Sequence, residues 1–233
     1  MALDKFKLSP KGNVQISLSW GSKKIDFQSG KYQILRKRIY AKKSYQFTVS
    51  GLTKDLEWLT SFYNSHYGQL KPFLFEYDGN VETVYFGGSL QLEVKREVGK
   101  IVGFSASITL DLDHRTATTS KALESDVLPR ASGNISKTID WNTKIYTSSS
   151  TTRRKERNTP ETKLSANFKG SKKERDKIIA LYESHEMIPL LFYYNNEKIK
   201  VRFPDSITLT DYREIKNIVG YSCDMDLEVV DNV

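Results

Sequence analysis

Two pairs of adjacent charged residues, Arg96-Glu97 and Arg213-Glu214, are the side chains of this sequence best suited to acid–base chemistry. A carboxylate beside a guanidinium could act as a general acid or base. Each pair, however, lies in a stretch that predicts a β-strand, and adjacent residues of a strand point to opposite faces of the sheet. The two groups therefore do not converge on one point. A repeated salt bridge at an interface is the better interpretation, because arginine suits interface ion pairs.

Two histidines, His66 and His185, stand at equivalent positions and could be metal ligands or general bases. Each ends a predicted helix, where a histidine can bond the last carbonyl groups and interact favourably with the helix dipole. No second histidine or cysteine lies nearby, and the neighbouring acidic residues lack the spacing that a metal site needs. We therefore expect no metal and no cofactor.

The sequence contains none of the common catalytic or phosphate-binding motifs, namely G-x-x-x-x-G-K-[ST], G-x-G-x-x-G, H-E-x-x-H and G-x-S-x-G. Gly103 and Gly220 are more typical of a bulge or tight backbone contact within a strand. Cys223 is the single cysteine, so it cannot form an intramolecular disulfide. We expect it to be a small buried core residue, as free cysteines usually are. The sequence thus predicts a protein that is not an enzyme.

The charged pairs belong to a longer repeat. Ile101-Val102-Gly103-Phe104-Ser105 follows the first pair, and Ile218-Val219-Gly220-Tyr221-Ser222 follows the second at the same spacing. Further matches occur in the same order in both halves: Ile25 and Ile139, Gly51 and Gly170, Tyr63 and Tyr182, His66 and His185, Pro72 and Pro189, Phe75 and Phe192, Tyr77 and Tyr194, Phe86 and Phe203, and Leu92 and Leu209. This colinear order predicts one architecture built twice.

The elements expected around these residues are mostly strands. Apolar residues at three- and four-residue spacing predict a helix over residues 53–67, capped by Thr53, and the capping box Ser171-Lys172-Lys173-Glu174 predicts the start of a second. Alternating runs around them predict strands. We expect a mainly β (α+β) fold of two tandem units, each an antiparallel β-sandwich or barrel flanked by one α-helix. The predicted units span residues 1–112 and 135–233, with a linker at 113–134 and a long polar arm at 147–163.

The charge of the chain is strongly positive. Its 233 residues carry a net charge of +8, concentrated in Arg36-Lys37-Arg38 and in Arg153-Arg154-Lys155-Glu156-Arg157. Such clusters are usually solvated loops or strand edges, but they also suit phosphates or an acidic partner. The mean hydropathy is −0.51, and no apolar run reaches the ~20 residues that span a bilayer. The first residues lack a signal-peptide core, so we expect assembly in the cytoplasm.

One segment resembles a known family. The pattern Leu56-x-x-Leu59-x-x-Phe62-x-x-x-x-x-Gly68-x-x-x-Pro72-Phe73-x-Phe75 is similar to the minor tail protein M and distal tail proteins of long-tailed bacteriophages. Upstream, Gly30-x-Tyr32-Gln33-x-x-Arg36-x-Arg38 resembles another stretch of those proteins. The resemblance covers residues 25–110, and the second half matches more weakly because its counterpart of Gly68 is deleted.

The resemblance implies two tail-tube-like units, each a β-sandwich flanked by a helix, that assemble in rings around a lumen. A duplicated chain could form a pseudo-hexameric ring as a trimer, which would join a six-fold tube to a three-fold tip. The implied function is a structural component of a siphophage tail tip in the virion, assembled in the host cytoplasm. Its implied partners are further copies of itself and the tube, tip hub and tape measure proteins, with DNA at most in transit through the lumen and no membrane insertion. The predicted interface residues are Arg36, Arg38, Arg96, Glu97, Arg153, Arg154, Arg213 and Glu214.

Two other functions stay open at this point. The first is a duplicated β-domain that binds nucleic acid through its basic clusters, for which affinity should fall steeply with salt concentration. The aromatic content of 12% would suit base stacking, although packing in the core also accounts for it. The second is a carbohydrate-binding module of a tail tip, which would need exposed aromatic side chains along a groove.

Overall fold

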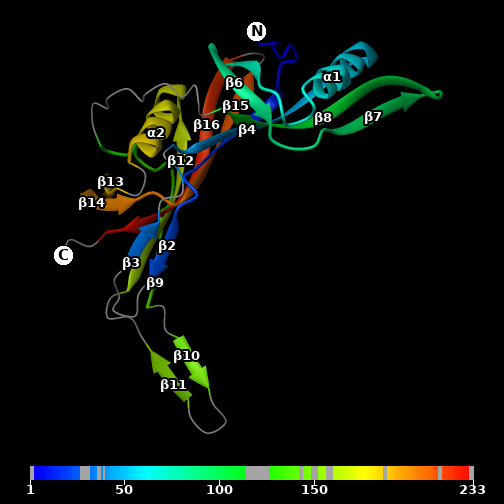
Figure 1. The fold of residues 1–233 in the computed structure, drawn as a ribbon. Helices are drawn as coiled ribbons and strands as arrows, with labels where there is room; N and C mark the ends of the chain where they lie inside the picture. The colour runs from blue at the N-terminus through cyan, green and yellow to red at the C-terminus, as the bar shows by residue number, and fades with distance from the viewer. Residues whose placement is uncertain are drawn as a thin grey trace. The chain divides into compact units, whose positions relative to one another are not determined.

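The computed structural model describes residues 3–26, 32–35, 38, 40–113, 126–141, 144–147, 152–155, 160–185, 188–214 and 217–230. Strands make up 58% of it, and it contains two helices among the described residues, which confirms a mainly β fold (Figure 1). The part of the predicted linker at 114–125 and residues 148–151 and 156–159 of the predicted arm at 147–163 lie outside the described residues.

The elements follow one another in the same order in both halves. The first half contains β1 (Lys11–Ser19), β2 (Lys23–Asp26), β3 (Tyr32–Leu35), β4 (Lys42–Gly51), α1 (Thr53–Ser65), β5 (Phe73–Tyr77), β6 (Asn80–Phe86), β7 (Gln91–Glu97) and β8 (Lys100–Leu112). The second half contains β9 (Ser136–Asp140), β10 (Lys144–Thr147), β11 (Thr152–Lys155), β12 (Glu161–Gly170), α2 (Lys172–His185), β13 (Leu190–Tyr194), β14 (Glu197–Arg202), β15 (Ser206–Glu214) and β16 (Asn217–Val229).

Most of the strands belong to one large antiparallel sheet. β4 lies between β1 and β8, while β8 also pairs with β6 and β7, and β6 pairs with β5. In the second half β12 lies between β9 and β16, while β16 also pairs with β14 and β15, and β14 pairs with β13. Two separate hairpins, β2–β3 and β10–β11, complete the described strands.

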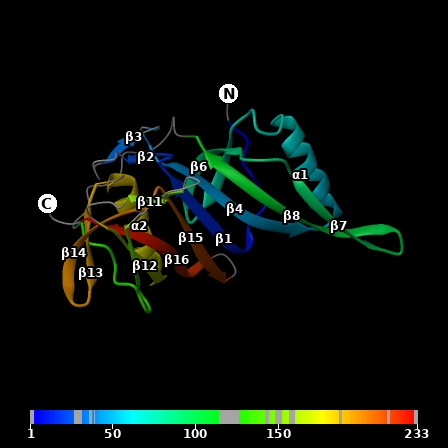
Figure 2. The same cartoon turned by 90° about the horizontal axis from the view of Figure 1, so that it is seen from below.

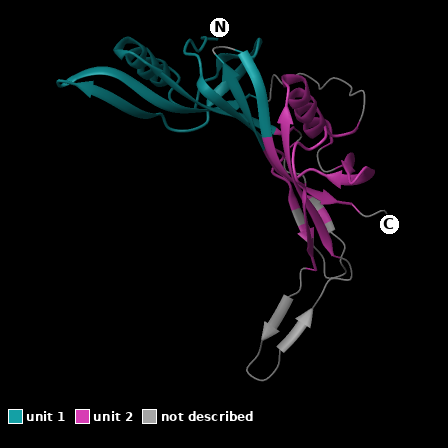
Figure 3. Ribbon diagram, turned by 180° about the vertical axis from the view of Figure 1, so that it is seen from behind, with its two compact units in different colours: residues 1–18, 42–119, 208–222 teal, residues 19–41, 120–207, 223–233 magenta. Residues whose placement is uncertain are grey.

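The compact units do not follow the order of the chain (Figure 3). Unit 1 comprises residues 1–18, 42–119 and 208–222, and unit 2 comprises residues 19–41, 120–207 and 223–233. The predicted division at residues 112 and 135 therefore differs from the observed one. The reason is that β1, β15 and β16 each cross a unit boundary, so that segment 208–222 is packed in unit 1 and segment 19–41 in unit 2.

The core of unit 1 is aromatic. The ring of Phe6 contacts the rings of Phe47, Trp58, Phe62, Phe73, Phe75 and Phe86, with centroid separations of 5.6 to 6.4 Å. Phe62 and Leu59 are the buried residues of α1, and Figure 2 shows this helix running alongside β8. Aromatic pairs of this kind add to the stability that burial provides. The short segment before β1 therefore contributes a central residue to the core.

The core of unit 2 is built on the same plan with fewer aromatic residues. Phe168 of β12 and Phe192 of β13 pack with ring centroids 5.9 Å apart, and α2 buries Ile178, Leu181 and Tyr182. Trp20, which belongs to this unit, is also buried and donates a hydrogen bond from Nε1 to the carbonyl oxygen of Tyr182 at 3.2 Å. Helix, strands and tryptophan thus form one packed body.

Both helices begin with a carboxylate that accepts a backbone N–H group. The N–H of Leu52 donates to Asp55 Oδ2 at 3.0 Å, and the N–H of Ser171 donates to Glu174 Oε2 at 2.9 Å. The reciprocal bond expected of Glu174 in the capping box is confirmed. The prediction that Thr53 caps the first helix is wrong, because its hydroxyl donates instead to the carbonyl oxygen of Ile101 at 3.0 Å.

Candidate interface

His66 of unit 1 lies between the end of α1 and the N-terminal segment and contacts both. Its ring is buried, Nδ1 donates to the carbonyl oxygen of Phe62 at 2.7 Å, and Nε2 lies 3.9 Å from the carboxylate of Asp4. The same segment is bonded to β5, because the N–H of Leu74 donates to Asp4 O and the N–H of Phe6 donates to Leu74 O, both at 2.8 Å. The histidine is thus a structural residue that bonds a helix carbonyl.

His185 of unit 2 makes the corresponding contacts. Nδ1 donates to the carbonyl oxygen of Leu181 at 3.2 Å, and Nε2 lies 3.5 Å from Asp126 Oδ1. The N–H of Leu191 donates to Asp126 O, and the N–H of Leu128 donates to Leu191 O, both at 2.9 Å. Residues 126–128 therefore occupy in unit 2 the place of residues 4–6 in unit 1. Leu128 is buried, so at this residue the exposed connector expected for the predicted linker 113–134 is wrong.

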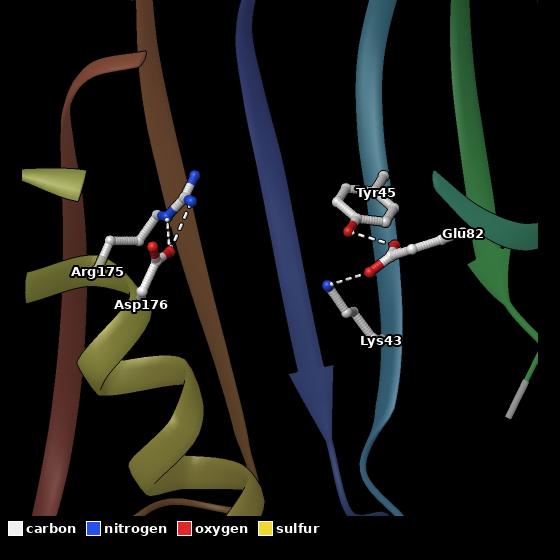
Figure 4. A network of polar contacts seen from close by, with 5 residues as sticks. All are labelled: Lys43, Tyr45, Glu82, Arg175 and Asp176. Atoms are coloured by element: carbon white, nitrogen blue, oxygen red, sulfur yellow. Dashed lines mark hydrogen bonds and ion pairs between the residues drawn. The ribbon is translucent and has the colours of Figure 1, made fainter. Parts of the chain in front are cut away.

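The buried and partly buried charged groups of the described residues are paired within their own units. Among the residues that the structure describes, no cluster of three or more histidine, cysteine or acidic side chains could hold a metal ion. In unit 1, the carboxylate of Glu82 accepts hydrogen bonds from Lys43 Nζ at 2.9 Å and from the Tyr45 hydroxyl at 2.5 Å. In unit 2, the guanidinium of Arg175 donates to Asp176 at 2.6 Å (Figure 4). In both groups, the contacts pair the carboxylate with cations or a hydroxyl of its own unit, which is an arrangement that stabilises structure.

Arg96 and Glu97 lie at the exposed end of the β7–β8 hairpin in unit 1. Every residue of β7 is exposed, and the register shifts between Lys95 and Arg96 as in a β-bulge. Glu97 stands opposite Lys100, and the two positive-φ residues Val98 and Gly99 form the turn. Figure 1 shows the hairpin extending away from the rest of unit 1. These side chains are accessible to another molecule.

Arg213, the residue that matches Arg96 in the repeat, is packed inside unit 1. Its Nη1 donates to the carbonyl oxygen of Pro10 at 3.0 Å, and the guanidinium lies 5.6 Å from the centroid of the Tyr77 ring. The hydroxyl of Tyr77 in turn donates to the buried carboxylate of Asp211 at 2.5 Å. Glu214 points to solvent. One member of the repeated arginine pair is therefore structural and the other is exposed.

Of the remaining predicted interface residues, Arg38, Arg153 and Arg154 are among those that the structure describes. Arg38 is exposed and donates to the carbonyl oxygen of Ser19 at 3.3 Å within unit 2, whereas Arg36 lies outside the described residues. Arg153 and Arg154 belong to β11, where their backbones pair with Tyr146 and Ile145 of β10. The eight predicted interface positions therefore stay a prediction, with Arg36 outside the described residues and only the backbones of Arg153 and Arg154 described.

The two halves share strand pairings and registers. Phe73 pairs with Val84 between β5 and β6, and at the matching positions Leu190 pairs with Val201 between β13 and β14. The next pairing is repeated as well, because Val84 stands opposite Leu112 and Val201 stands opposite Val229. Beside β12, β9 takes the place that β1 takes beside β4. The predicted match of Ile139 to Ile25 is therefore wrong, because Ile25 lies in β2 and Ile139 lies in β9.

A signal for the match between β1 and β9 was present in the sequence. Gly12-Asn13 precedes Trp20 by the same number of residues as Gly133-Asn134 precedes Trp141. The flanking residues differ in type, so the similarity emerges only once the strand neighbours are known. The acidic residues Asp4 and Asp126 were missed for the same reason.

The comparisons with known proteins give no assignment. Neither a protein-family model nor a curated protein matches this chain. None of the helices among the described residues is long and apolar enough to cross a membrane.

Proposed function

We propose that this chain is a structural component of the tail tip of a long-tailed bacteriophage and consists of two tandem tail-tube-like units. The observation that carries the proposal is the repeated strand register. Two β-hairpins, and the strands next to them, pair at corresponding positions of both halves. The aspartate–histidine contact at the end of each helix supports the same duplication, since Asp4 and His66 correspond to Asp126 and His185.

The duplication gives the chain a role in ring assembly. Three copies of a two-unit chain present six similar units, which can close as a pseudo-hexameric ring through heterologous interfaces. Such a ring would continue a six-fold tail tube and present three-fold symmetry to the tip. The similarity of residues 56–75 to tail proteins of long-tailed phages supports this role. The protein would contact the tube, tip hub and tape measure proteins, without enzymatic activity.

The mass of the purified protein tests the proposal. We expect sedimentation equilibrium to give three times the 26.8 kDa of one chain, and negative-stain electron microscopy to show closed rings. The measurement is repeated over a range of protein and salt concentrations, because ring assembly depends on mass action. A chain that stays monomeric throughout would contradict the proposal.

Binding to duplex DNA provides the opposing outcome. A protein that uses its basic clusters against phosphates binds DNA with an affinity that falls linearly with salt on a logarithmic scale. Tight, salt-sensitive binding by the monomer would favour the duplicated nucleic-acid-binding domain. A tail ring should show no useful affinity for free DNA.

A further inference from the structure

Among the described strands of the large sheet, β5, β7, β9 and β13 each have one neighbour, and β7 and β9 are the two whose counterparts in the other half are paired on both sides. Of these two, β7 has β8 as its single described neighbour, and β9 has β12. Their counterparts in the other half are β15 and β1, and these two strands are neighbours of each other. An edge strand exposes a row of unpaired backbone groups and readily pairs with another chain. The pairing of β1 with β15 therefore offers a pattern that the open edges of β9 and β7 could follow with another chain.

The contacts between β1 and β15 within unit 1 define a template. The hydroxyl oxygens of Ser17 and Thr208 lie 3.2 Å apart, and Arg213 donates to the carbonyl oxygen of Pro10. The chain numbers rise along one strand and fall along the other, so the two strands run antiparallel. The other face of the pair is buried, where Ile16 and Leu18 of β1 accompany Leu209 of β15.

We propose that β9 of one chain pairs antiparallel with β7 of a second copy, in the register that joins β1 to β15. This inference rests on the proposed duplication and names the contact that closes the ring. In the repeat, Thr138 of β9 corresponds to Ser17 of β1, and Gln91 of β7 corresponds to Thr208 of β15. The contact of Ser17 with Thr208 therefore predicts a contact of Thr138 with Gln91 of the next copy. Both residues are exposed in the single chain.

Exposed apolar side chains on the two strands support the pairing. Val94 of β7 is 40% exposed and Ile139 of β9 is 53% exposed, and Leu92 is exposed as well. The positions that match them in β15 and β1 are Asp211, Leu18 and Leu209, all of which are buried. Covering such side chains contributes favourable free energy in proportion to the apolar area removed from water. The strands thus carry the apolar face of an interface that the single chain does not complete.

Trp141 supplies an anchor at the end of β9. Its side chain is 50% exposed, whereas its counterpart Trp20 is 4% exposed and donates to the carbonyl oxygen of Tyr182 on α2. The residue of α1 that matches Tyr182 is Tyr63, so Trp141 should pack at Tyr63 of the next copy. Tryptophan is enriched among the residues that dominate binding energy at interfaces.

The same correspondence between the two halves gives Arg96 a partner in the next copy. Arg213 donates to Pro10 and lies over Tyr77. The matching groups in the second half are the carbonyl of Ala131 and the ring of Tyr194, which is partly exposed. Arg96, exposed on β7, would make these two contacts with the next copy.

Site-directed cross-linking tests the register. Directly opposite residues of an antiparallel pair have Cβ atoms about 4.5–5.5 Å apart, close enough for a disulfide after small adjustments. Two single-cysteine variants, Gln91→Cys and Thr138→Cys, are prepared on a Cys223→Ala background. Oxidation of the mixture should give a covalent dimer, and oxidation of either variant alone should give none. The variant with both cysteines should give covalent oligomers up to the closed ring.

An intramolecular control uses the template itself. The Ser17→Cys, Thr208→Cys variant should form a disulfide within one chain, seen as altered mobility on a non-reducing gel. If this control oxidises and the protein assembles into rings, but the mixture stays uncross-linked, the strand pairing is wrong while the ring proposal stands. If the protein is monomeric at every concentration, the ring proposal itself fails and so does the pairing.

A second variant keeps the test independent of cysteine chemistry. Trp141→Ala should raise the dissociation constant of assembly about thirtyfold or more, as for a dominant interface residue. Its circular dichroism and thermal midpoint as a monomer should match the wild type. Trp20→Ala is the matched control, because loss of this buried side chain should lower the thermal midpoint. Unchanged assembly of Trp141→Ala would overturn the proposed contact.

Discussion

At the scale of single residues, positions that match in the repeat have different environments in the two halves. Val94 and Asp211 correspond in the repeat, yet the first is exposed and the second is buried against Tyr77. The sequence could reveal that both arginines of the repeat matter, but it could not tell which one is packed. That distinction depends on whether β1 or open solvent lies beside the strand, and the pairing joins residues about two hundred positions apart in the chain.

Cys223 allows a prediction at this scale. Burial, and to a lesser extent the nearby carboxylate of Asp224, together raise the pKa of its thiol from the ordinary value of 9.0 to about 12. The reactive form of cysteine is the thiolate. We therefore expect labelling by a disulfide reagent at pH 8 to be at least about a hundredfold slower in the folded protein than in urea. Equal rates would show that the thiol is accessible.

The same pKa shift has a consequence for stability. In the unfolded chain the thiol loses its proton near pH 9, while in the folded chain it stays protonated to about pH 12. The unfolded state thus binds fewer protons between these values, and the contribution of Cys223 to stability falls as the pH rises above 9. The fall in urea midpoint between pH 8 and pH 10 should therefore be smaller in Cys223→Ala than in the wild type. Alanine fits because Ala106 occupies the matching position in the first half.

At the scale of elements, the helices were the most predictable part of the fold. Their apolar spacing and the acidic residue in the first turn are local features, and both helices begin within one residue of the expected position. The cap of α1 was missed because Leu52 has no polar side chain and the carboxylate of Asp55 replaces it. The strand neighbours were not predictable, since period-two patterns identify strands without specifying which strands pair.

Removal of the two capping carboxylates should weaken the helices to a similar extent. Asp55→Ala and Glu174→Ala each leave the N–H of Leu52 or Ser171 without its acceptor, which should cost about 1 kcal/mol of unfolding free energy. Urea denaturation followed by circular dichroism measures the loss. Glu57→Ala provides the control, because this exposed side chain also lies near the start of α1 and its removal should change stability by less than about 0.5 kcal/mol. An equal effect of Glu57→Ala would assign the loss to helix-dipole charge rather than capping.

At the scale of the whole molecule, the repeat of strand pairings connects the fold to assembly. Strand β1 pairs with β15 within the chain, whereas β7 and β9 each have one described neighbour. If β9 pairs with β7 of a second copy as proposed, each chain can add a further copy at two edges, and the addition would end when a ring closes. The sequence resemblance suggested a ring from family likeness, whereas the open edges suggest one from hydrogen-bonding geometry.

The two matched arginines separate assembly from folding. Arg96→Glu should abolish ring formation, because it places a carboxylate where the guanidinium would donate to a backbone carbonyl of the next copy, and like partial charges then repel. The thermal midpoint of the monomer should stay within about 1 °C of the wild type, since the side chain is exposed. Arg213→Ala should instead cost about 1–3 kcal/mol through loss of its bond to Pro10 and its contact with Tyr77, which lowers the midpoint by about 2–4 °C per kcal/mol. Sedimentation and differential scanning calorimetry on both variants give the comparison. Normal rings from Arg96→Glu, or an unchanged midpoint in Arg213→Ala, would each contradict the role assigned to that arginine.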